Sequence, residues 1–409
     1  MTGATETQRG LVVVGASLAG LRAVESARRT GFTGPVTLVG SEPHLPYDRP
    51  PLSKAYLDEA EPPAVVYREE DKLAELEVDL VLGEPASALD PQRRAVLVGD
   101  REILFDSVVL ATGARARSLP DTGHLAGVHT LRTLDDAREI RAALDAGART
   151  VVIGAGFIGS EVASAARKRG LSATIVEAQP TPLVRSIGTV MGDALTDLHR
   201  AHGTEMRCGT AVDGLEGTDR VTGVRLVDGT VIPADLVVVG IGAVPETDWL
   251  ESSGITVDNG IVCDETLWTG VAGVFAAGDV ARWRNPQFDA VMRIEHWTCA
   301  AEQGGRAARN ALDTSAAKPY STVPYFWSDW YDSRIQFVGI PGGDDVEVVS
   351  GAVEQGQFVA LYRTADRLTG ALTLDRQSDV MKYRTQIAKR ATWSEALEFA
   401  RTRESARAS

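Results

Sequence analysis

The sequence predicts an α/β protein with two similar βαβ units and a smaller α+β domain at its C-terminal end. A glycine-rich turn between an apolar strand and a helix occurs twice, about 140 residues apart. Residues 323–409 lack this pattern, and their sequence is typical of short antiparallel strands followed by a helical tail. With 409 residues the chain is too long for one ordinary hydrophobic core, so two or three domains are expected.

The first βαβ unit spans residues 11–42. Residues 11–14 are all apolar, as in a parallel strand buried on both faces, and they lead into the turn Gly15-Ala16-Ser17-Leu18-Ala19-Gly20. A helix follows as far as Arg28 or Arg29, and a second strand, 36–39, ends near Ser41 and Glu42. This order is typical of a Rossmann-like unit that binds an adenine dinucleotide. The pyrophosphate would lie against Gly15, Ser17, Ala19 and Gly20, and the ribose would contact Ser41 or Glu42.

The second unit repeats the pattern with all three glycines present. Strand 150–153 leads into Gly154-Ala155-Gly156-Phe157-Ile158-Gly159, a helix continues to about Arg169, and strand 173–176 ends at Glu177. Gly154 allows the tight turn, Gly156 lets a pyrophosphate approach the backbone, and Gly159 lets helix and strand pack closely. The helix N-terminus offers N–H groups to the phosphates. Glu177 would accept hydrogen bonds from the adenosine ribose, which favours NADH over NADPH, although Arg185 lies nearby in the sequence.

Three further apolar runs are expected to be buried strands. Residues 106–113 and 234–242 would each close one dinucleotide domain, and their turns contain Thr112, Gly113 and Gly242. Residues 274–279 end in Gly278 and Asp279. A carboxylate beside that turn is suited to accept a hydrogen bond from a flavin ribityl hydroxyl.

Together these motifs resemble the two-dinucleotide-domain flavoproteins of the disulfide-reductase superfamily over almost the whole chain. The stretch Pro46-Tyr47-Asp48-Arg49-Pro50-Pro51-Leu52-Ser53-Lys54 resembles the signature of bacterial ferredoxin reductases of the putidaredoxin-reductase type. Stretches 131–137, 294–297, 302–303 and 325–329 are similar to that family as well. The resemblance implies an FAD-binding domain of residues 1–116 and 247–322, an NADH-binding domain of residues 117–246, and a C-terminal α+β interface domain of residues 323–409.

The cysteines separate this sequence from other branches of the superfamily. Cys208, Cys263 and Cys299 are scattered, so neither a disulfide framework nor a metal site is expected. Relatives that reduce disulfides or peroxides need a cysteine pair, or one cysteine soon after the first acid-tipped strand. Residues 36–60 contain no cysteine. The electrons are therefore expected to leave for a partner protein rather than for a disulfide.

The resemblance implies hydride transfer from NADH to FAD, then single-electron transfer to a [2Fe–2S] ferredoxin that supplies a cytochrome P450 or a Rieske-type oxygenase. It places Lys54 at the flavin ring and pairs it with Glu161 as a positioning device. Phe157 either covers the flavin and moves aside for the nicotinamide, or only packs in the core. The resemblance also places Arg132 near the flavin and its pyrophosphate, and Trp297 at the ring edge, although Trp297 could instead be a core aromatic. The remaining candidate cofactor-binding residues are Arg49, Ala86, Ile158 and Trp327.

Charge and composition limit the partners. The net charge of −14 argues against nucleic acid, and no stretch reaches the ~20 apolar residues of a membrane helix. Residues 1–9 are polar, and we expect a flexible lead-in, a cytoplasmic protein and a monomer or weak homodimer. The expected ferredoxin is acidic and binds transiently, so arginines should surround its entrance. Arg306 and Arg309 are candidates for this role, or they belong to an ordinary solvated helix face.

The C-terminal region leaves more alternatives open. Its aromatic residues Tyr325, Phe326, Trp327, Trp330 and Tyr331 either cover a flavin edge and mark the ferredoxin entrance, or fill a domain interface. Residues 336–339, 347–349 and 358–362 are expected as antiparallel strands, and residues 401–409 as a disordered tail. A rubredoxin reductase, an NADH oxidase and a signalling flavoprotein like apoptosis-inducing factor remain alternative functions.

Overall fold

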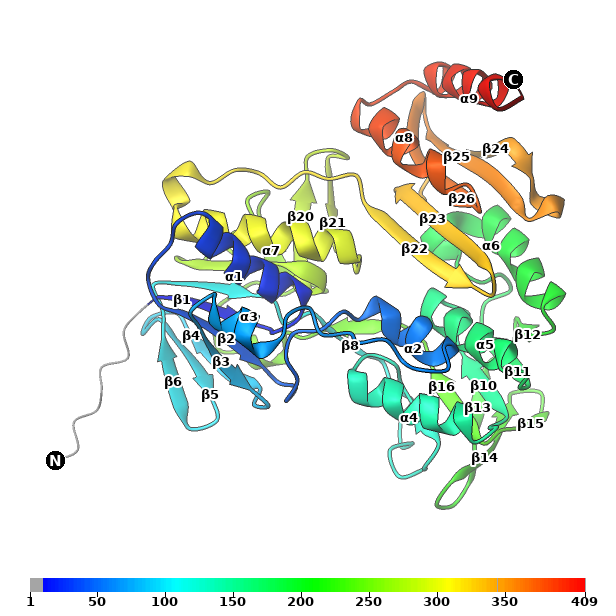
Figure 1. The fold of residues 1–409 in the computed structure, drawn as a ribbon, viewed down its shortest axis with the longest axis horizontal. Coiled ribbons are helices and arrows are strands. Elements are labelled where there is room, and N and C mark those ends of the chain that lie inside the picture. The colour runs from blue at the N-terminus through cyan, green and yellow to red at the C-terminus, as the bar shows by residue number, and fades with distance from the viewer. Residues whose placement is uncertain (1–9, 344, 409) are drawn as a thin grey trace. The chain divides into compact units, whose positions relative to one another are not determined.

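The computed structural model of the chain describes residues 10–343 and 345–408. These residues form two compact units, each assembled from separate stretches of the chain (Figure 1). The first unit contains residues 10–48, 65–115 and 244–324, and the second contains residues 49–64, 116–243 and 325–408. Residues 1–9, expected as a flexible lead-in, lie outside the described residues.

The first unit is built on a parallel sheet with the strand order β19-β7-β1-β2-β3. Its strands are β1 (Leu11–Val14), β2 (Val36–Gly40), β3 (Val78–Leu82), β7 (Ser107–Leu110) and β19 (Val274–Ala276). β1 lies in the middle and all four of its side chains are buried. A strand covered on both faces has no polar side, and this explains the unbroken apolar run.

Two helices, α1 (Leu18–Arg29) and α7 (Trp297–Leu312), pack against each other in this unit (Figure 1). The contact is close because a Cβ added to Gly304 would lie 2.0 Å from the carbonyl oxygen of Ala19. Two smaller sheets complete the unit. One contains β4 (Ala86–Asp90), β5 (Ala95–Val98) and β6 (Arg101–Leu104), and the other contains β18 (Ile261–Cys263), β20 (Ala281–Asn285) and β21 (Ala290–Met292).

The second unit contains a parallel sheet with the order β12-β11-β10-β16-β9. Its strands are β9 (Val128–His129), β10 (Thr150–Ile153), β11 (Ala173–Glu177), β12 (Glu205–Cys208) and β16 (Leu236–Val239). The helices of this region are α4 (Leu134–Asp145), α5 (Phe157–Lys168) and α6 (Val184–Ala201), and a small antiparallel sheet is formed by β13 (Val212–Gly217), β14 (Val221–Leu226) and β15 (Val231–Pro233).

An antiparallel sheet of the order β22-β23-β26-β25-β24 belongs to the same unit. Its strands are β22 (Tyr325–Trp330), β23 (Ser333–Gly339), β24 (Asp345–Ala352), β25 (Gln357–Thr364) and β26 (Arg367–Leu374), followed by α8 (Gln377–Ala388) and α9 (Trp393–Ala408). The predicted fold class, with parallel-sheet nucleotide-binding regions and a C-terminal α+β region, is confirmed.

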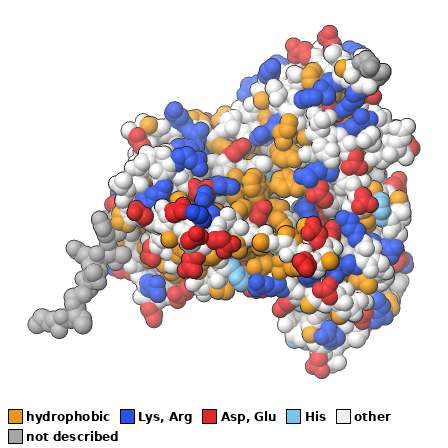
Figure 2. All heavy atoms as spheres, in the orientation of Figure 1, with side chains coloured by type: hydrophobic (Ala, Val, Ile, Leu, Met, Phe, Trp, Pro, Cys, Tyr) orange, Lys and Arg blue, Asp and Glu red, His pale blue; other side chains and the backbone are white. Residues whose placement is uncertain are grey.

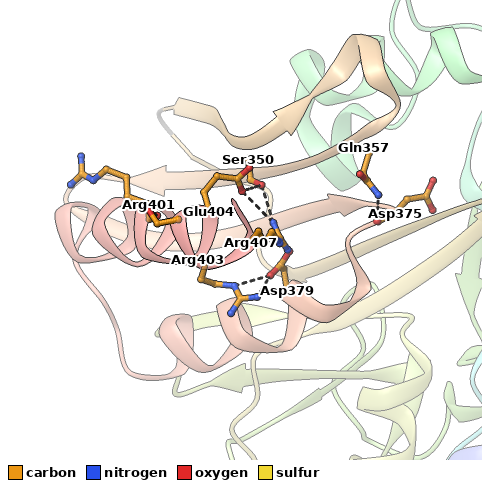
Figure 3. Close-up of polar contacts among 9 residues, drawn as sticks. Ser350, Gln357, Asp375, Asp379, Arg401, Arg403, Glu404 and Arg407 are labelled. Atoms are coloured by element: carbon orange, nitrogen blue, oxygen red, sulfur yellow. Dashed lines mark hydrogen bonds and ion pairs between the residues drawn. The ribbon is translucent and has the colours of Figure 1, made fainter. Parts of the chain in front are cut away.

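The expectation of a disordered tail over residues 401–409 is wrong for the described residues, because α9 continues to Ala408. Asp379 on α8 is only 1% exposed and accepts hydrogen bonds from Arg403, at 2.8 Å, and from Arg407, as Figure 3 shows. Glu404 accepts a hydrogen bond of 2.5 Å from Ser350 of β24. These contacts hold a segment whose polar sequence alone suggested disorder; Ser409 lies outside the described residues.

Residues 49–64, assigned from the sequence to the FAD domain, cluster with the second unit. They form η1 (Pro50–Ser53) and α2 (Ala55–Asp58), and Asp58 makes a 2.9 Å ion pair with Lys168 of α5. The other short elements are α3 (Glu70–Ala74), β8 (Ala114–Ala116), β17 (Ala243–Pro245), η2 (Asp248–Leu250), η3 (Gly278–Val280), η4 (Thr314–Ala316) and η5 (Val353–Gln355).

Within residues 10–343 and 345–408, no helix combines the length and the apolar character needed to cross a membrane. The same residues bring together no group of three His, Cys, Asp or Glu side chains that could hold a metal ion.

Candidate functional site

The first glycine turn connects β1 to α1 in the first unit. Gly15 has φ +117°, and a Cβ at this position would lie 2.0 Å from the carbonyl oxygen of Ala111. A Cβ on Gly20 would lie 1.9 Å from the carbonyl oxygen of Gly15. Backbone contacts therefore require glycine at both positions. Ser17 stands between them in an extended conformation as the N-cap of α1.

The ends of two neighbouring strands meet this turn. Thr112 and Gly113 follow β7, and the Thr112 hydroxyl donates to the carbonyl oxygen of Glu246 at 2.8 Å. Gly278 follows β19, and a Cβ there would lie 3.1 Å from Cβ of Ala19. Asp279 comes next and is partly exposed. The carboxyl edge of a parallel sheet is where such folds bind their ligands.

A buried amide next to Gly278 supports a polar ligand here. Gln303 of α7 is 1% exposed, and its Oε1 accepts the N–H of Gly278 at 2.8 Å. Its Nε2 is buried and has no acceptor among the described residues. Buried donors normally find a partner, so a hydrogen-bonding ligand such as FAD fits this edge.

Glu42 and Ser41 follow β2 in the same unit. Tyr47 donates a hydrogen bond from its hydroxyl to the Glu42 carboxylate, whereas Ser41 is exposed. The sequence left these two residues as alternatives for the ribose, and the hydrogen bond gives Glu42 the more defined position.

Trp297, at the first turn of α7, belongs to a polar cluster that the sequence did not predict. Its indole N–H lies 2.8 Å from Oδ1 of Asp48 and 3.1 Å from the hydroxyl of Tyr67, which itself donates to Asp48 at 2.6 Å. Burial, and then the Asp48 carboxylate, raise the pKa of Tyr67. Asp48 lies within the motif of residues 46–54, which was the available signal. Ala86, another candidate, lies in β4 opposite Val98.

The three glycines of the second turn have two different roles. A Cβ on Gly154 would lie 2.4 Å from the carbonyl oxygen of Gly240, and a Cβ on Gly159 would lie 2.8 Å from Cγ1 of Val152. Gly156 has φ −78°, and a Cβ there would meet only the Gly240 oxygen at 3.8 Å. Protein packing thus requires the outer two glycines and leaves open space beside the middle one. That space fits a dinucleotide pyrophosphate.

Glu177 closes this second cradle. One of its carboxylate oxygens accepts the N–H of Ala155 at 2.8 Å, and the other accepts the N–H of Gln179 at 2.9 Å. Each oxygen retains a lone pair for a ribose hydroxyl. Ile158 is 44% exposed, Arg185 is exposed near the start of α6, and Gly242, with φ +109°, has nothing within 4 Å of a Cβ.

The predicted pair of Lys54 and Glu161 is present in the second unit. Lys54 Nζ lies 2.8 Å from Oε1 of Glu161, whose side chain is 3% exposed. Ser53 donates to the other oxygen of Glu161, and Ser328 donates to Oε1. A buried carboxylate is costly unless it is paired and hydrogen-bonded, and these three donors meet that requirement. The two serines were missed because they lie 108 and 167 residues from Glu161 in the sequence.

The other candidates in this unit have different surroundings. Phe157 packs on Phe326 with ring centroids 4.7 Å apart. Trp327 stacks on Tyr325 at 5.8 Å, and an Arg334 guanidinium lies 5.8 Å from its ring. Arg49 donates to the carbonyl oxygen of Arg132 at 2.6 Å, which brings these two candidates together. The roles of Phe157, Trp327, Arg49 and Arg132 at a cofactor stay predictions.

Cys208, Cys263 and Cys299 are present as thiols rather than in a disulfide. Cys263 and Cys299 are buried, and burial raises the pKa of Cys263. Burial and the nearby Glu177 carboxylate also raise the pKa of Cys208. A raised pKa disfavours the thiolate, which is the reactive form.

Comparisons with known proteins identify the family of the chain. The family model for pyridine nucleotide-disulphide oxidoreductases matches residues 9–304, and the reductase C-terminal model matches residues 325–402. Rhodocoxin reductase from Rhodococcus erythropolis is 40% identical over 382 residues, which cover 92% of this chain and 89% of the relative. Putidaredoxin reductase from Pseudomonas putida is 37% identical over 375 residues, covering 90% and 88%.

A crystal structure of the covalent putidaredoxin reductase–putidaredoxin complex superimposes with a TM-score of 0.89 at 34% identity, covering 97% of this chain and 99% of that chain. The resemblance to bacterial ferredoxin reductases that the sequence motifs indicated is confirmed. The chain therefore belongs to the pyridine nucleotide-disulphide oxidoreductase family, with a reductase C-terminal domain after the nucleotide-binding region.

Proposed function

We propose that the protein is an NADH-dependent ferredoxin reductase of a cytochrome P450 or Rieske-type oxygenase system. Family membership implies FAD and NAD(H) as cofactors. The proposal depends above all on one observation: two glycine turns, each shaped by contacts that only glycine allows, occur in a chain of isolated cysteines. FAD supplies the chemistry, since it accepts two electrons together and releases them one at a time.

For FAD, we assign the pyrophosphate to the turn from Gly15 to Gly20 and the ribityl chain to Asp279. Glu42 is the preferred ribose acceptor because Tyr47 orients its carboxylate. Gln303 adds a donor that the sequence did not indicate. Its unsatisfied Nε2 lies on the residue that holds Gly278, directly before Asp279.

For NADH, we assign the pyrophosphate to Gly156 and the adenosine ribose to Glu177. A 2′-phosphate would meet the Glu177 carboxylate, whose position is fixed by two backbone N–H groups. Like charges at such a site cost binding free energy, so NADPH should bind more weakly. Arg185 is exposed and shows no ion pair with Glu177 that would cancel this repulsion.

The ion pair of Lys54 and Glu161 is assigned to the nicotinamide site. Hydride transfer needs no proton from the protein, so the pair acts by position rather than as an acid and base. Three donors fix the Glu161 carboxylate, and the carboxylate in turn fixes the Lys54 ammonium. This arrangement supports a role in orienting the nicotinamide.

The ferredoxin would dock against a group of arginines on the first unit. A pocket between α1 and α7 is lined by Arg22, Arg29 and Arg309 together with Ser26 and Glu302. Burial, and then the like charges of Arg306 and Arg29, lower the pKa of Arg309. Basic side chains are visible over α1 and α7 in Figure 2. An acidic partner would relieve that repulsion, although the chain as a whole carries −14.

The test combines acceptors and variants. Anaerobic protein with NADH should reduce a [2Fe–2S] ferredoxin faster than a rubredoxin, and oxygen uptake without acceptor should be slow. Arg309→Ala should lower kcat/KM for ferredoxin and flatten its salt dependence, with ferricyanide reduction unchanged. Arg93→Ala, which removes an exposed arginine of the hairpin between β4 and β5, should change neither.

Each alternative function has its own outcome in that assay. Faster rubredoxin reduction would favour a rubredoxin reductase, and rapid oxygen uptake an NADH oxidase. A long-lived complex with NADH, and negligible electron flow to any acceptor, would favour a signalling flavoprotein. Equal ferredoxin kinetics in Arg309→Ala and Arg93→Ala would reject the docking assignment.

A further inference from the structure

Strand β22 contacts one face of helix α5 within the second unit. Phe157 and Glu161 are four residues apart, so they lie on the same face of α5. Phe326, Ser328 and Trp330 alternate along β22 and therefore share one face of the strand. The Phe157 ring lies 4.7 Å from Phe326 and 6.1 Å from Trp330, and Ser328 donates to Glu161. One strand face thus contacts both Phe157, a candidate cover of the flavin, and Glu161, the expected partner of Lys54.

Ser328 is held in one orientation. It is fully buried, and its Oγ accepts the indole N–H of Trp330 at 2.8 Å while donating to Oε1 of Glu161. A serine hydroxyl has a single proton. Because Trp330 occupies a lone pair, that proton is directed at the carboxylate, which already accepts from Lys54 and Ser53.

The same side chains also anchor the strand to elements other than α5. Trp330 is 1% exposed and stacks on His199 of α6 with ring centroids 4.5 Å apart. Phe326 stacks on Phe337 of β23 at 5.5 Å. These contacts belong to the core of the antiparallel sheet, so the position of Glu161 is tied to that core.

We propose that β22 is a positioning strand, in which Ser328, oriented by Trp330, holds Glu161 and thereby Lys54 in place for NADH. This inference rests on the proposed function only in placing Glu161 at the nicotinamide. The C-terminal sheet then takes part in the reaction with NADH through a positioning residue that the sequence did not reveal.

The kinetic test uses anaerobic stopped-flow reduction of the holoprotein by NADH without ferredoxin. Ser328→Ala should lower the limiting rate of flavin reduction by about tenfold, the order expected when a hydrogen bond to a charged group is lost. The apparent Kd for NADH should stay unchanged, because the pyrophosphate and ribose contacts remain. Trp330→Phe keeps an aromatic ring but removes the indole N–H, so a smaller loss of rate is expected. In a Glu161→Gln background, Ser328→Ala should have almost no further effect.

Thr373→Val is the matched control. Thr373 lies in β26 of the same sheet, is fully buried, and its Oγ1 has no hydrogen-bond partner among the described residues. Its replacement removes a buried hydroxyl without touching Glu161, so the rate of flavin reduction should not change. A tenfold loss in this variant as well would overturn the proposal in favour of general disturbance of the sheet.

Thermal unfolding provides a readout that does not depend on turnover. Ser328→Ala and Glu161→Gln should each lower Tm, and together by less than the sum, because they remove the same contact. Additive losses with an unchanged rate of reduction would reduce Ser328 to ordinary packing and overturn the proposal. If NADH does not reduce the flavin of the wild-type protein, the proposed function fails. The Tm values of the two single variants and the double variant still test whether Ser328 and Glu161 interact.

Discussion

The middle glycine of the second turn offers the sharpest separation of ligand binding from folding. Gly156→Ala adds a Cβ whose nearest atom outside its own stretch of chain is the Gly240 carbonyl oxygen, 3.8 Å away. Its φ of −78° is one that alanine adopts without strain. Alanine is less favourable than glycine at a helix N-cap by up to about 1 kcal/mol. It also removes freedom from the unfolded chain, which stabilises by about 0.4–1 kcal/mol. The two terms offset each other, so the Tm should not change.

The effect on NADH should be large, because the added methyl occupies the space that the pyrophosphate requires. The apparent Kd for NADH should rise at least about tenfold, which corresponds to about 1.4 kcal/mol. Gly159→Ala is the contrasting variant. Its Cβ would lie 2.5 Å from the carbonyl oxygen of Gly154 and 2.8 Å from Val152, so overpacking of about 1–3 kcal/mol should lower Tm.

Differential scanning calorimetry and anaerobic stopped-flow reduction of the same preparations would provide both numbers. Unchanged NADH affinity in Gly156→Ala would refute the assignment of the pyrophosphate to this turn. A lowered Tm in Gly156→Ala would show that protein packing, rather than a ligand, requires glycine at this position.

Four further predictions concern single side chains. Glu177→Ala should narrow the preference for NADH over NADPH, mainly through KM. If the ratio of kcat/KM for the two nucleotides stays unchanged in steady-state assays, Glu177 does not recognise the ribose. Asp279→Ala should weaken FAD retention, measured as flavin absorbance after gel filtration. Full occupancy by FAD in this variant would show that Asp279 does not hold the flavin. Asp379→Asn should release α9, because breaking a buried ion pair costs about 3–5 kcal/mol, and hydrogen exchange over residues 393–408 should then accelerate. Burial lowers the pKa of His199 to about 3, whereas in the unfolded chain the pKa is about 6.5. The neutral imidazole therefore contributes its full stability above about pH 6.5. As the pH falls below about 6.5, the free energy of unfolding decreases by up to about 1.4 kcal/mol per pH unit. Thermal melts of His199→Asn between pH 5 and pH 8 should show a shallower loss in acid than wild type, and an identical slope would contradict a neutral buried imidazole.

The sequence predicted the parts of the fold that local pattern determines. The apolar runs at β1 and β10 identify buried parallel strands, and the glycine spacing identifies the turns that follow them. The ion pair of Lys54 and Glu161 was available only through the family motif. Nothing in the local pattern around either residue connects positions 107 residues apart.

The misses share a physical cause, because each depends on contacts distant in sequence. Ser328 becomes a partner of Glu161 only when β22 packs on α5. Residues 401–408 are helical because Asp379, more than twenty residues earlier, neutralises Arg403 and Arg407. The composition of this tail is polar and charged, which is typical of disorder. The buried carboxylate that orders the tail lies elsewhere in the sequence.

The measurement closest to the central claim uses a cysteine-free variant, Cys208→Ser with Cys263→Ala and Cys299→Ala. In the proposed reaction, electrons pass from NADH to FAD in a chain without a thiol relay. With FAD occupancy and Tm checked first, anaerobic NADH should bleach the flavin of this variant completely, and reduction of a [2Fe–2S] ferredoxin should proceed at close to the wild-type rate. A folded, yellow variant that NADH cannot bleach, or that bleaches but no longer reduces ferredoxin, would contradict it.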